Sequence, residues 1–308
     1  MASTVCEGIL LPLITPFDHQ GELDEPVLRE LTEFMVASGV HGLFILGSAG
    51  QGPVMTLPQR RRAAEVVVNQ VRGRIPVVTH VGCADTESTI ELALHARSVG
   101  SSAIAVVPPY YYSDHLDYEI LEHYKAVAAA LGGDFPMYFY DNPLYSGIHV
   151  TPEMVKRYLE AVPSFCGIKA AYVGVEELLK YIRMTPEQFG VFSGSVFNMI
   201  ATVPLGLKGA IHPPTSFFPE LCVGLWEAIQ KQRWQESFEY QRKLYDLVTA
   251  MEKFKAKGRG VLAAVARLRG FAVKRYPRWK VEEFSPKEIE SLETDVEKAG
   301  IALKAAVR

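Results

Sequence analysis

The sequence GILLPLITPF, residues 8–17, contains no charged side chain. A strand whose successive residues are apolar is buried on both faces, and such strands are typical of parallel sheets. A parallel sheet covered by helices either closes into a (β/α)8 barrel or stays open and doubly wound. The open form that binds dinucleotides has a GxGxxG pattern after its first strand, and no such pattern follows residues 8–17. The stretch therefore favours the barrel.

Seven similar apolar runs follow, and segments with helical periodicity separate them. In the first such segment, Val27, Leu31 and Phe34 lie at the i, i+4 and i+7 positions of one helical face. Eight strand–helix units within about 225 residues match the usual size of a (β/α)8 barrel. We therefore expect an α/β fold, a TIM barrel, over residues 1–230. The seven runs are GLFILG (42–47), IPVVTHVG (75–82), AIAVVPPYY (103–111), FPMYFYDNP (135–143), FCGIKAA (165–171), FGVFSGS (189–195) and GAIHPP (209–214).

The pattern changes after residue 230, where the apolar runs end. Ser285 and Glu288 have the spacing of a capping box around Pro286, which marks the start of a helix. No linker or low-complexity tract divides the chain, so we expect residues 231–308 to be a three-helix extension of a single barrel domain. The three predicted helices cover residues 234–254, 260–275 and 285–300.

The overall composition narrows the classes of function. The 308 residues are 48% hydrophobic with a formal net charge of −3, so the chain can bury a large core and has no basic surface for nucleic acid. No apolar stretch approaches the roughly 20 residues that span a bilayer, and the N-terminus lacks the pattern of a signal peptide. The four cysteines are scattered without a CxxC pair, which favours reduced thiols over a zinc site. We expect a cytoplasmic protein without nucleic-acid or membrane partners.

Residues 165–171, FCGIKAA, contain Lys169 within an apolar strand. Burial of an ammonium group is costly, because desolvation disfavours the charged form and lowers the lysine pKa. In a TIM barrel the active site lies at the C-terminal ends of the strands, and Lys169 falls near that end of the sixth strand. A neutral amine in an apolar pocket is a nucleophile that forms a Schiff base with a carbonyl substrate. The alternative is a barrel-interior lysine that pairs with a carboxylate.

Three further clusters are expected at the same rim of the barrel. GSAGQG (47–52) follows the second strand, and its glycines allow backbone N–H groups to bind a carboxylate. PPYYYS (108–113) ends the fourth strand. YFYDNP (138–143) ends the fifth strand, where the phenol of Tyr140 could exchange protons with a carbinolamine on Lys169. Each cluster alone is an ordinary turn or aromatic packing, but their common position favours an active site.

With these motifs the chain resembles the dihydrodipicolinate synthase/N-acetylneuraminate lyase family of class I pyruvate aldolases. The resemblance extends from Gly8 to the last predicted helix, essentially the whole chain. The resemblance rests on four family motifs. The Gly-[Ser/Thr]-Thr-Gly-Glu loop corresponds to residues 47–51, Pro-Tyr-Tyr to 109–111, Pro-x-x-Leu-Tyr-Asn-x-Pro to 136–143 and Gly-[Ile/Val/Leu]-Lys to 167–169.

The resemblance implies a role for each of four side chains. Lys169 would form an imine with pyruvate or another 2-oxo acid, and Tyr140 would be the general acid and base. Ser48 would relay the proton between Tyr140 and Tyr111, with Tyr111 reaching in from a neighbouring subunit. The family usually forms a homotetramer, a dimer of dimers, and we expect the same here.

The resemblance also implies how the substrate is held. The backbone of Gly47, Ser48 and Ala49 would bind the carboxylate of the 2-oxo acid, and the carbonyl of Ile211 would face the lysine. The chemistry needs no metal and no other cofactor, so the expected partner is a small-molecule 2-oxo acid.

Four departures from the family pattern bear on the substrate. Ala49 replaces a threonine that helps bind the carboxylate, and Tyr145 replaces the arginine with which dihydrodipicolinate synthases bind a second carboxylate. Ser195 stands where sialate lyases begin an Asp-Glu pair, and Asp141 replaces an asparagine. We expect Asp141, Tyr145 and the loop 195–198 to form the pocket mouth, with no arginine at position 145; an arginine or lysine supplied by another part of the chain would undo this argument. Such a mouth favours 2-keto-3-deoxy sugar acids over aspartate semialdehyde with pyruvate.

Three alternatives stay open. A 4-hydroxy-tetrahydrodipicolinate synthase, which condenses pyruvate with aspartate semialdehyde, would start from the same imine. A non-catalytic relative that only binds a 2-oxo acid would need no proton relay. A metal-dependent hydrolase could use His80, His212 and Asp141, which all lie at predicted strand ends, although the first strand has no His-x-His pattern.

Overall fold

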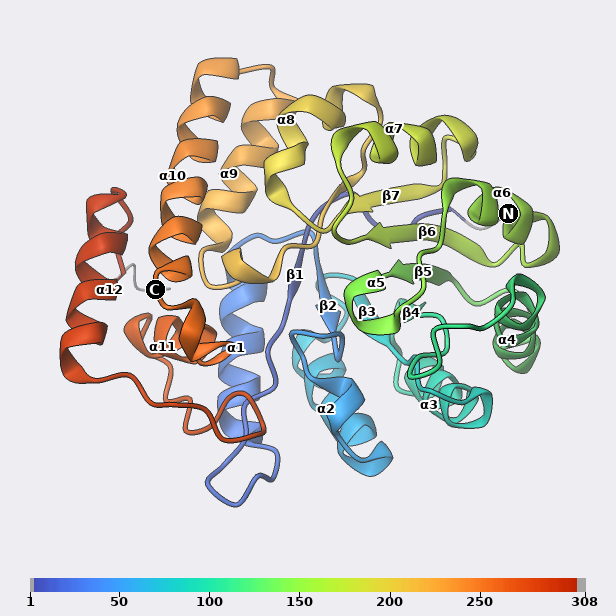
Figure 1. Cartoon of the computed structure of the whole chain (residues 1–308), viewed down its shortest axis with the longest axis horizontal. Helices are drawn as coiled ribbons and strands as arrows, with labels where there is room; N and C mark the ends of the chain where they lie inside the picture. The colour runs from blue at the N-terminus through green and yellow to red at the C-terminus, as the bar shows by residue number, and fades with distance from the viewer. Residues whose placement is uncertain (1–2, 304–308) are drawn as a thin grey trace.

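The computed structural model describes residues 3–303, and its eight parallel strands close into a barrel in the order of the sequence (Figure 1). The barrel closes where Gly8 and Ile9 of the first strand pair with Gly209 and Ala210 of the eighth. The expected TIM barrel is therefore confirmed. The strands are β1 (Gly8–Pro12), β2 (Gly42–Ile45), β3 (Val77–His80), β4 (Ala103–Val106), β5 (Met137–Asp141), β6 (Phe165–Ala170), β7 (Gly190–Ser193) and β8 (Gly209–Ala210).

Helices surround the barrel as an outer layer (Figure 1). The predicted stripe of the first helix is confirmed, since Val27, Leu31 and Phe34 are buried. Up to residue 230 the helices are α1 (Glu25–Ala37), α2 (Leu57–Val71), α3 (Thr86–Ser98), α4 (Asp117–Ala130), α5 (Pro143–Ser146), α6 (Pro152–Ala161), α7 (Val175–Met184), α8 (Met199–Thr202) and α9 (Pro219–Gln230). Short 3₁₀ turns are η1 (Gly52–Val54), η2 (Val196–Asn198), η3 (Val203–Leu205), η4 (Pro213–Thr215) and η5 (Lys255–Lys257).

The three predicted C-terminal helices are present as α10 (Trp234–Glu252), α11 (Gly260–Leu268) and α12 (Pro286–Lys298). Helix α10 packs between α9 and α12 (Figure 1), and the capping box of Ser285 and Glu288 begins α12 as predicted. Helix α11 ends before its predicted end because Gly270, with φ +96°, reverses the chain. The division of the chain at residue 230 stays a prediction, and its outer ends, residues 1–2 and 304–308, lie outside the described residues.

Each strand is shorter than the apolar run that predicted it, and most of the residues that follow the strand within its run lie in loops or short turns at the C-terminal rim. After β2 the chain leaves extended geometry at Leu46, with φ +60°, and Gln51, with φ +58°. After β4 the residues Pro108 and Pro109 lack the N–H groups that a further strand would need. The candidate motifs GSAGQG (47–52) and PPYYYS (108–113) therefore lie on short loops held by the barrel, whereas Tyr140 and Lys169 lie on β5 and β6 themselves. None of the helices within residues 3–303 is long and apolar enough to span a membrane.

Side chains along a strand alternate between the barrel interior and the helical layer. On β5, Tyr138 and Tyr140 belong to the inner cluster, whereas Met137 and Phe139 pack under the helices. On β6 the register shifts, so that Met137 pairs with Phe165 while Tyr138 already pairs with Gly167. This irregularity inserts an extra residue into β6 and resets which side chains point inward.

Candidate active site

Gly167 occupies the register shift of β6, two residues before Lys169. A Cβ atom at this position would overlap the ring of Tyr138 and the carbonyl oxygen of Gly190, so the site accepts only glycine. After the shift, Tyr140 of β5 pairs with Lys169 of β6. The Gly-Ile-Lys sequence thus places the lysine side chain inside the barrel next to a tyrosine.

Lys169 is 3% exposed and lies among aromatic rings. Its amine is 4.1 Å from the centre of the Phe44 ring and 4.3 Å from the centre of the Tyr140 ring. Burial lowers the pKa of Lys169, and the adjacent Tyr140 opposes this only in part. No carboxylate among residues 3–303 forms an ion pair with the amine, so the alternative of a charge-paired interior lysine has no partner there. The geometry favours a population of neutral amine.

The hydroxyl of Tyr140 is the centre of a small polar network. It lies 3.1 Å from the hydroxyl of Ser48 and accepts a hydrogen bond of 2.8 Å from the side-chain amide of Asn142. Burial alone would raise the pKa of Tyr140, but the neighbouring Lys169 and the hydrogen bonds outweigh it, so the pKa lies below its ordinary value. Tyr140 can therefore exchange a proton with Ser48 and with a group on Lys169.

The loop after β2 brings Ser48 to this network. A Cβ at Gly47 would come within 2.6 Å of the Phe44 ring, so the close approach of the loop requires glycine there. The carbonyl of Ala49 accepts a hydrogen bond of 2.8 Å from the hydroxyl of Tyr276, and the side-chain oxygen of Gln51 accepts one of 2.7 Å from a backbone N–H of the same C-terminal segment. Segments that are more than 220 residues apart thus fix the loop.

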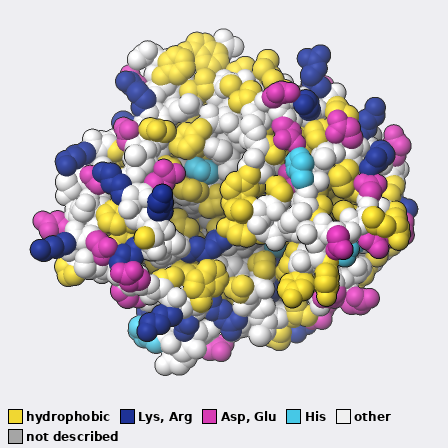
Figure 2. Space-filling view, in the orientation of Figure 1, with side chains coloured by type: hydrophobic (Ala, Val, Ile, Leu, Met, Phe, Trp, Pro, Cys, Tyr) yellow, Lys and Arg dark blue, Asp and Glu magenta, His cyan; other side chains and the backbone are white. Residues whose placement is uncertain are grey.

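Two adjacent cavities open at this end of the barrel. The inner chamber has a volume of about 340 Å³ and is the one that contains Lys169. The outer chamber has a volume of about 380 Å³ and extends toward Tyr110 and Trp279. Figure 2 shows a hollow near the middle of the face in view. Both chambers are lined by Ser48, Tyr140, Asn142, Tyr145 and Arg259.

Several residues predicted for the site line the inner chamber. Ile211 and Ser195 lie there with Lys169, and Tyr145 lies on the wall between the chambers. The side-chain amide of Asn198 instead donates to the carbonyl of Val173 and to the hydroxyl of Ser193. The loop 195–198 therefore contributes Ser195 to the chamber, while Asn198 stabilises the loop.

Tyr111 lies away from both chambers of its own chain. Its side chain is 84% exposed, with φ +89°, and its ring packs against Tyr112 with the ring centres 5.1 Å apart. An exposed aromatic residue in this backbone conformation is unusual and indicates a constraint on its position. Within residues 3–303 of one chain, no contact brings Tyr111 to Ser48.

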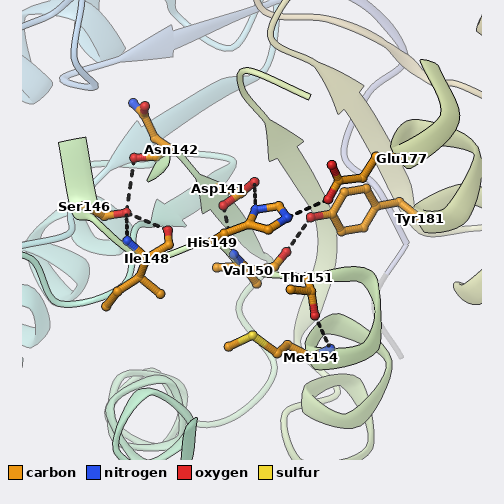
Figure 3. Close-up of polar contacts among 10 residues, drawn as sticks. All are labelled: Asp141, Asn142, Ser146, Ile148, His149, Val150, Thr151, Met154, Glu177 and Tyr181. Atoms are coloured by element: carbon orange, nitrogen blue, oxygen red, sulfur yellow. Dashed lines mark hydrogen bonds and ion pairs between the residues drawn. The ribbon is translucent and has the colours of Figure 1, made fainter. Parts of the chain in front are cut away.

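Asp141 does not line the pocket mouth, and the expectation that it does is wrong. Because Tyr140 points into the barrel, the next side chain on β5 points out of it. The carboxylate is fully buried, lies 2.9 Å from Nδ1 of His149, and accepts a bond of 2.9 Å from the N–H of Val150 (Figure 3). The other ring nitrogen of His149 lies 2.6 Å from Glu177 (Figure 3). The negative charge of Asp141 is therefore balanced by His149 outside the barrel.

Arg259 is a site residue that the sequence did not suggest. It directly precedes α11, and its guanidinium donates hydrogen bonds of 2.9 Å to the carbonyl of Ser48 and 2.9 Å to the hydroxyl of Tyr145. The mouth therefore contains an arginine, supplied by a distant part of the chain and not by position 145. Arg259 lies more than 110 residues from Tyr145 in the sequence, in the unremarkable segment AKGRG, and no local pattern marks it.

Among the residues that line the outer chamber, three buried polar atoms lack a hydrogen-bond partner in the described part of the chain. They are Nε2 of His80, Nε2 of Gln51 and Oδ1 of Asn142. Burial and the charge of Arg60 lower the pKa of His80 to about 3, so its imidazole is neutral. Polar atoms of this kind in a cavity are available to water, a ligand or a neighbouring chain.

The residues suggested for a metal site do not converge. His80 bonds to the carbonyl of Leu46 through Nδ1, and Asp141 faces away from the chambers. His212 lies in the inner chamber, and burial lowers its pKa to about 3. No group of three or more His, Cys, Asp or Glu side chains within residues 3–303 is arranged to hold a metal ion. This geometry does not support the metal-dependent hydrolase.

Comparison with known proteins identifies the family of the chain. The sequence profile of the dihydrodipicolinate synthetase family matches residues 5–299. The 4-hydroxy-tetrahydrodipicolinate synthase of Desulfotalea psychrophila is 32% identical over 244 residues, which cover 79% of this chain and 80% of that protein. The probable 2-dehydro-3-deoxy-D-pentonate aldolase YjhH of Escherichia coli is 34% identical over 227 residues, which cover 72% of this chain and 73% of that protein.

A solved structure extends the similarity to the whole fold. YagE, a prophage protein of the dihydrodipicolinic acid synthase family from E. coli K12 crystallised with pyruvate, superposes with a TM-score of 0.87 at 26% identity. The superposition covers 97% of this chain and 100% of that one. The chain therefore belongs to the dihydrodipicolinate synthetase family of class I, Schiff-base-forming lyases and aldolases.

Proposed function

We propose that this protein cleaves, or in the reverse direction forms, a 2-keto-3-deoxy acid, with pyruvate bound as an imine to Lys169. The observation that carries the proposal is a buried lysine with a lowered pKa and no carboxylate partner in the described residues, paired across two strands with Tyr140. A neutral amine in an apolar chamber is what nucleophilic attack on a ketone requires.

The proposed reaction begins when the Lys169 amine attacks the C2 carbonyl of the 2-oxo acid. Tyr140 donates a proton to the carbinolamine hydroxyl, which leaves as water, and a protonated imine results. In cleavage, the C3–C4 bonding electrons move into this imine and form an enamine, while the C4 hydroxyl loses its proton to Tyr140 and becomes an aldehyde. Protonation of C3 and hydrolysis then release pyruvate. The contact of Tyr140 with Ser48 supports a proton relay through these groups.

The substrate carboxylate is proposed to bind at the loop of Gly47, Ser48 and Ala49, with the Ile211 carbonyl facing the amine. The fixed position of this loop supports the proposal, because a preorganised set of donors binds an anion with little reorganisation. The buried methyl group of Ala49 supplies no hydrogen bond to the carboxylate, so recognition there depends on the backbone and on Ser48.

A homotetramer, a dimer of dimers, is part of the proposal. In it Tyr111 enters the outer chamber of a neighbouring subunit and reaches Ser48. The exposure and left-handed backbone of Tyr111 support this role, as do the unpartnered polar atoms of the outer chamber. A cytoplasmic location is also proposed, supported by the four free cysteines.

A second candidate is the condensation of pyruvate with aspartate semialdehyde. Arg259 favours it, because a guanidinium at the mouth suits a carboxylate, and the Desulfotalea relative carries the name of such a synthase. The E. coli aldolase relative and the neutral donors Tyr145 and Ser195 favour the keto-deoxy acid. Coupled assays of pyruvate release from 2-keto-3-deoxy acids and from sialate, beside pyruvate consumption with aspartate semialdehyde, separate the two. A protein that turns over none of them would instead be the binding relative.

A further inference from the structure

We propose that Arg259 binds a carboxylate at the end of the substrate remote from the 2-oxo acid. The inference rests on the proposed imine chemistry at Lys169 and adds the substrate class, a 2-oxo-3-deoxy acid that carries a second carboxylate. Arg259 would then be a specificity-determining residue supplied by the segment before α11.

Some N–H groups of the Arg259 guanidinium have no acceptor within residues 3–303. Of its five N–H groups, one on Nη1 and one on Nη2 are used within residues 3–303, by the carbonyl of Ser48 and the hydroxyl of Tyr145. Both acceptors are neutral, so these bonds do not compensate the positive charge. The remaining N–H groups can bind a carboxylate side by side, which is the strongest geometry that arginine offers.

The position of the guanidinium is fixed before any substrate arrives. The two acceptors lie on different segments, the loop after β2 and helix α5, and the guanidinium carbon lies 5.4 Å from the centre of the Tyr145 ring. An arginine restrained in this way loses little conformational freedom on binding an anion. Tyr145 therefore holds the arginine as well as lining the chamber.

The charge of the chambers matches a dianion. The described lining residues of both chambers include no Asp or Glu, whereas Lys169 and Arg259 are both present in the inner one. Lys169 lies buried in the barrel, and Arg259 is half-buried at the wall that the inner chamber shares with the outer one. A 2-oxo acid joined to Lys169 through C2 extends its remaining carbons away from the strand, toward Tyr145 and Arg259. The far end of this substrate reaches Arg259, whose charge no Asp or Glu among the described lining residues neutralises.

The test compares two six-carbon substrates that differ only at C6, a 2-oxo-3-deoxyhexonate ending in a hydroxymethyl group and the corresponding hexarate ending in a carboxylate. We expect the wild type to prefer the dianion in kcat/KM by about tenfold or more. Arg259→Gln should lower this preference by about 10- to 100-fold, and Arg259→Lys, which keeps the charge without the fork, by less. The condensation of pyruvate with aspartate semialdehyde is assayed with the same variants, because the carboxylate of the semialdehyde is the other group that Arg259 could bind.

Arg61→Gln is the control for loss of one positive charge, because Arg61 pairs with Glu91 on the surface of α2. It should leave the preference unchanged. A wild type that prefers the hydroxymethyl substrate overturns the inference. An equal loss of kcat/KM on both substrates in folded Arg259→Gln also overturns it, because the arginine would then only stabilise the surrounding segments. Reductive trapping of pyruvate in the wild type is measured in parallel. If pyruvate is not trapped, the imine proposal itself is wrong. If pyruvate is trapped but the enzyme shows no preference for the second carboxylate, only the proposed role of Arg259 is wrong.

Discussion

The amine of Lys169 lies 4.3 Å from the centre of the Tyr140 ring, and the two residues pair across β5 and β6. The register shift at Gly167 produces this relationship, because it turns Lys169 to the same side of the sheet as Tyr140. The backbone hydrogen bonds of the barrel, and not a mobile loop, therefore fix the positions of Lys169 and Tyr140 relative to each other.

Removal of the Tyr140 hydroxyl tests the proton-transfer role. Tyr140→Phe should keep the buried ring and its packing but lower kcat about 10²–10⁴-fold, the usual contribution of general acid–base catalysis. Tyr138→Phe is the matched control, since Tyr138 is also an inward-facing tyrosine of β5, but its hydroxyl bonds to Thr4 and not to the lysine site. A Tyr140→Phe enzyme within threefold of wild type, measured by steady-state pyruvate release, would make Tyr140 a core aromatic and no more.

Restoration of a hydroxyl at position 49 tests carboxylate binding. Ala49→Thr should lower KM for the 2-oxo acid with little change in kcat, because one hydrogen bond to a charged group contributes about 1.5–3 kcal/mol. Ala49→Val has a similar volume without the hydroxyl and separates the hydrogen bond from crowding at this buried site. If both variants raise KM equally, the small side chain is there to make room for the substrate.

The ion cluster of Asp141, His149 and Glu177 predicts a pH dependence of stability (Figure 3). The hydrogen bond with Asp141 is the main reason that the pKa of His149 rises from about 6.5 to about 9. A raised pKa means that folding favours the protonated ring, so this contribution is fully present below about pH 6.5 and is lost as the pH rises through about 9.

Urea unfolding of wild type and His149→Gln measures this contribution across the same pH range. The difference in unfolding free energy between the two proteins should be largest at neutral and lower pH and should shrink toward alkaline pH. Other groups titrate in both proteins, so only the difference reports on His149. A constant difference from about pH 6 to about pH 10 would mean that the ring is not charged in the folded protein.

The sequence predicted those features that depend on local pattern. Eight apolar runs at regular spacing are enough for the barrel, and a lysine in one of them is enough to suggest a nucleophile. The orientation of Asp141 was within reach of the same reasoning, because it must lie opposite to Tyr140 on β5. The family resemblance places Asp141 beside the pocket, whereas the alternation of side chains along β5 places it on the opposite face from Tyr140.

Other features depend on contacts between distant segments. Arg259 meets Ser48 across 211 residues and Tyr145 across 114, and no periodicity connects them. The register shift at Gly167 likewise follows from its fit against Tyr138 and Gly190. A sequence alone does not specify such contacts, and the arginine beside Tyr145 is one of them.

Reduction of the protein with borohydride in the presence of pyruvate tests whether Lys169 forms an imine with the 2-oxo acid. Mass spectrometry of the intact chain and of its peptides should show one three-carbon unit per chain, attached to Lys169. Lys169→Ala should remain folded, judged by its circular dichroism, and should take up no label. An unchanged mass of the wild-type protein, or a label on any other lysine, would contradict the account.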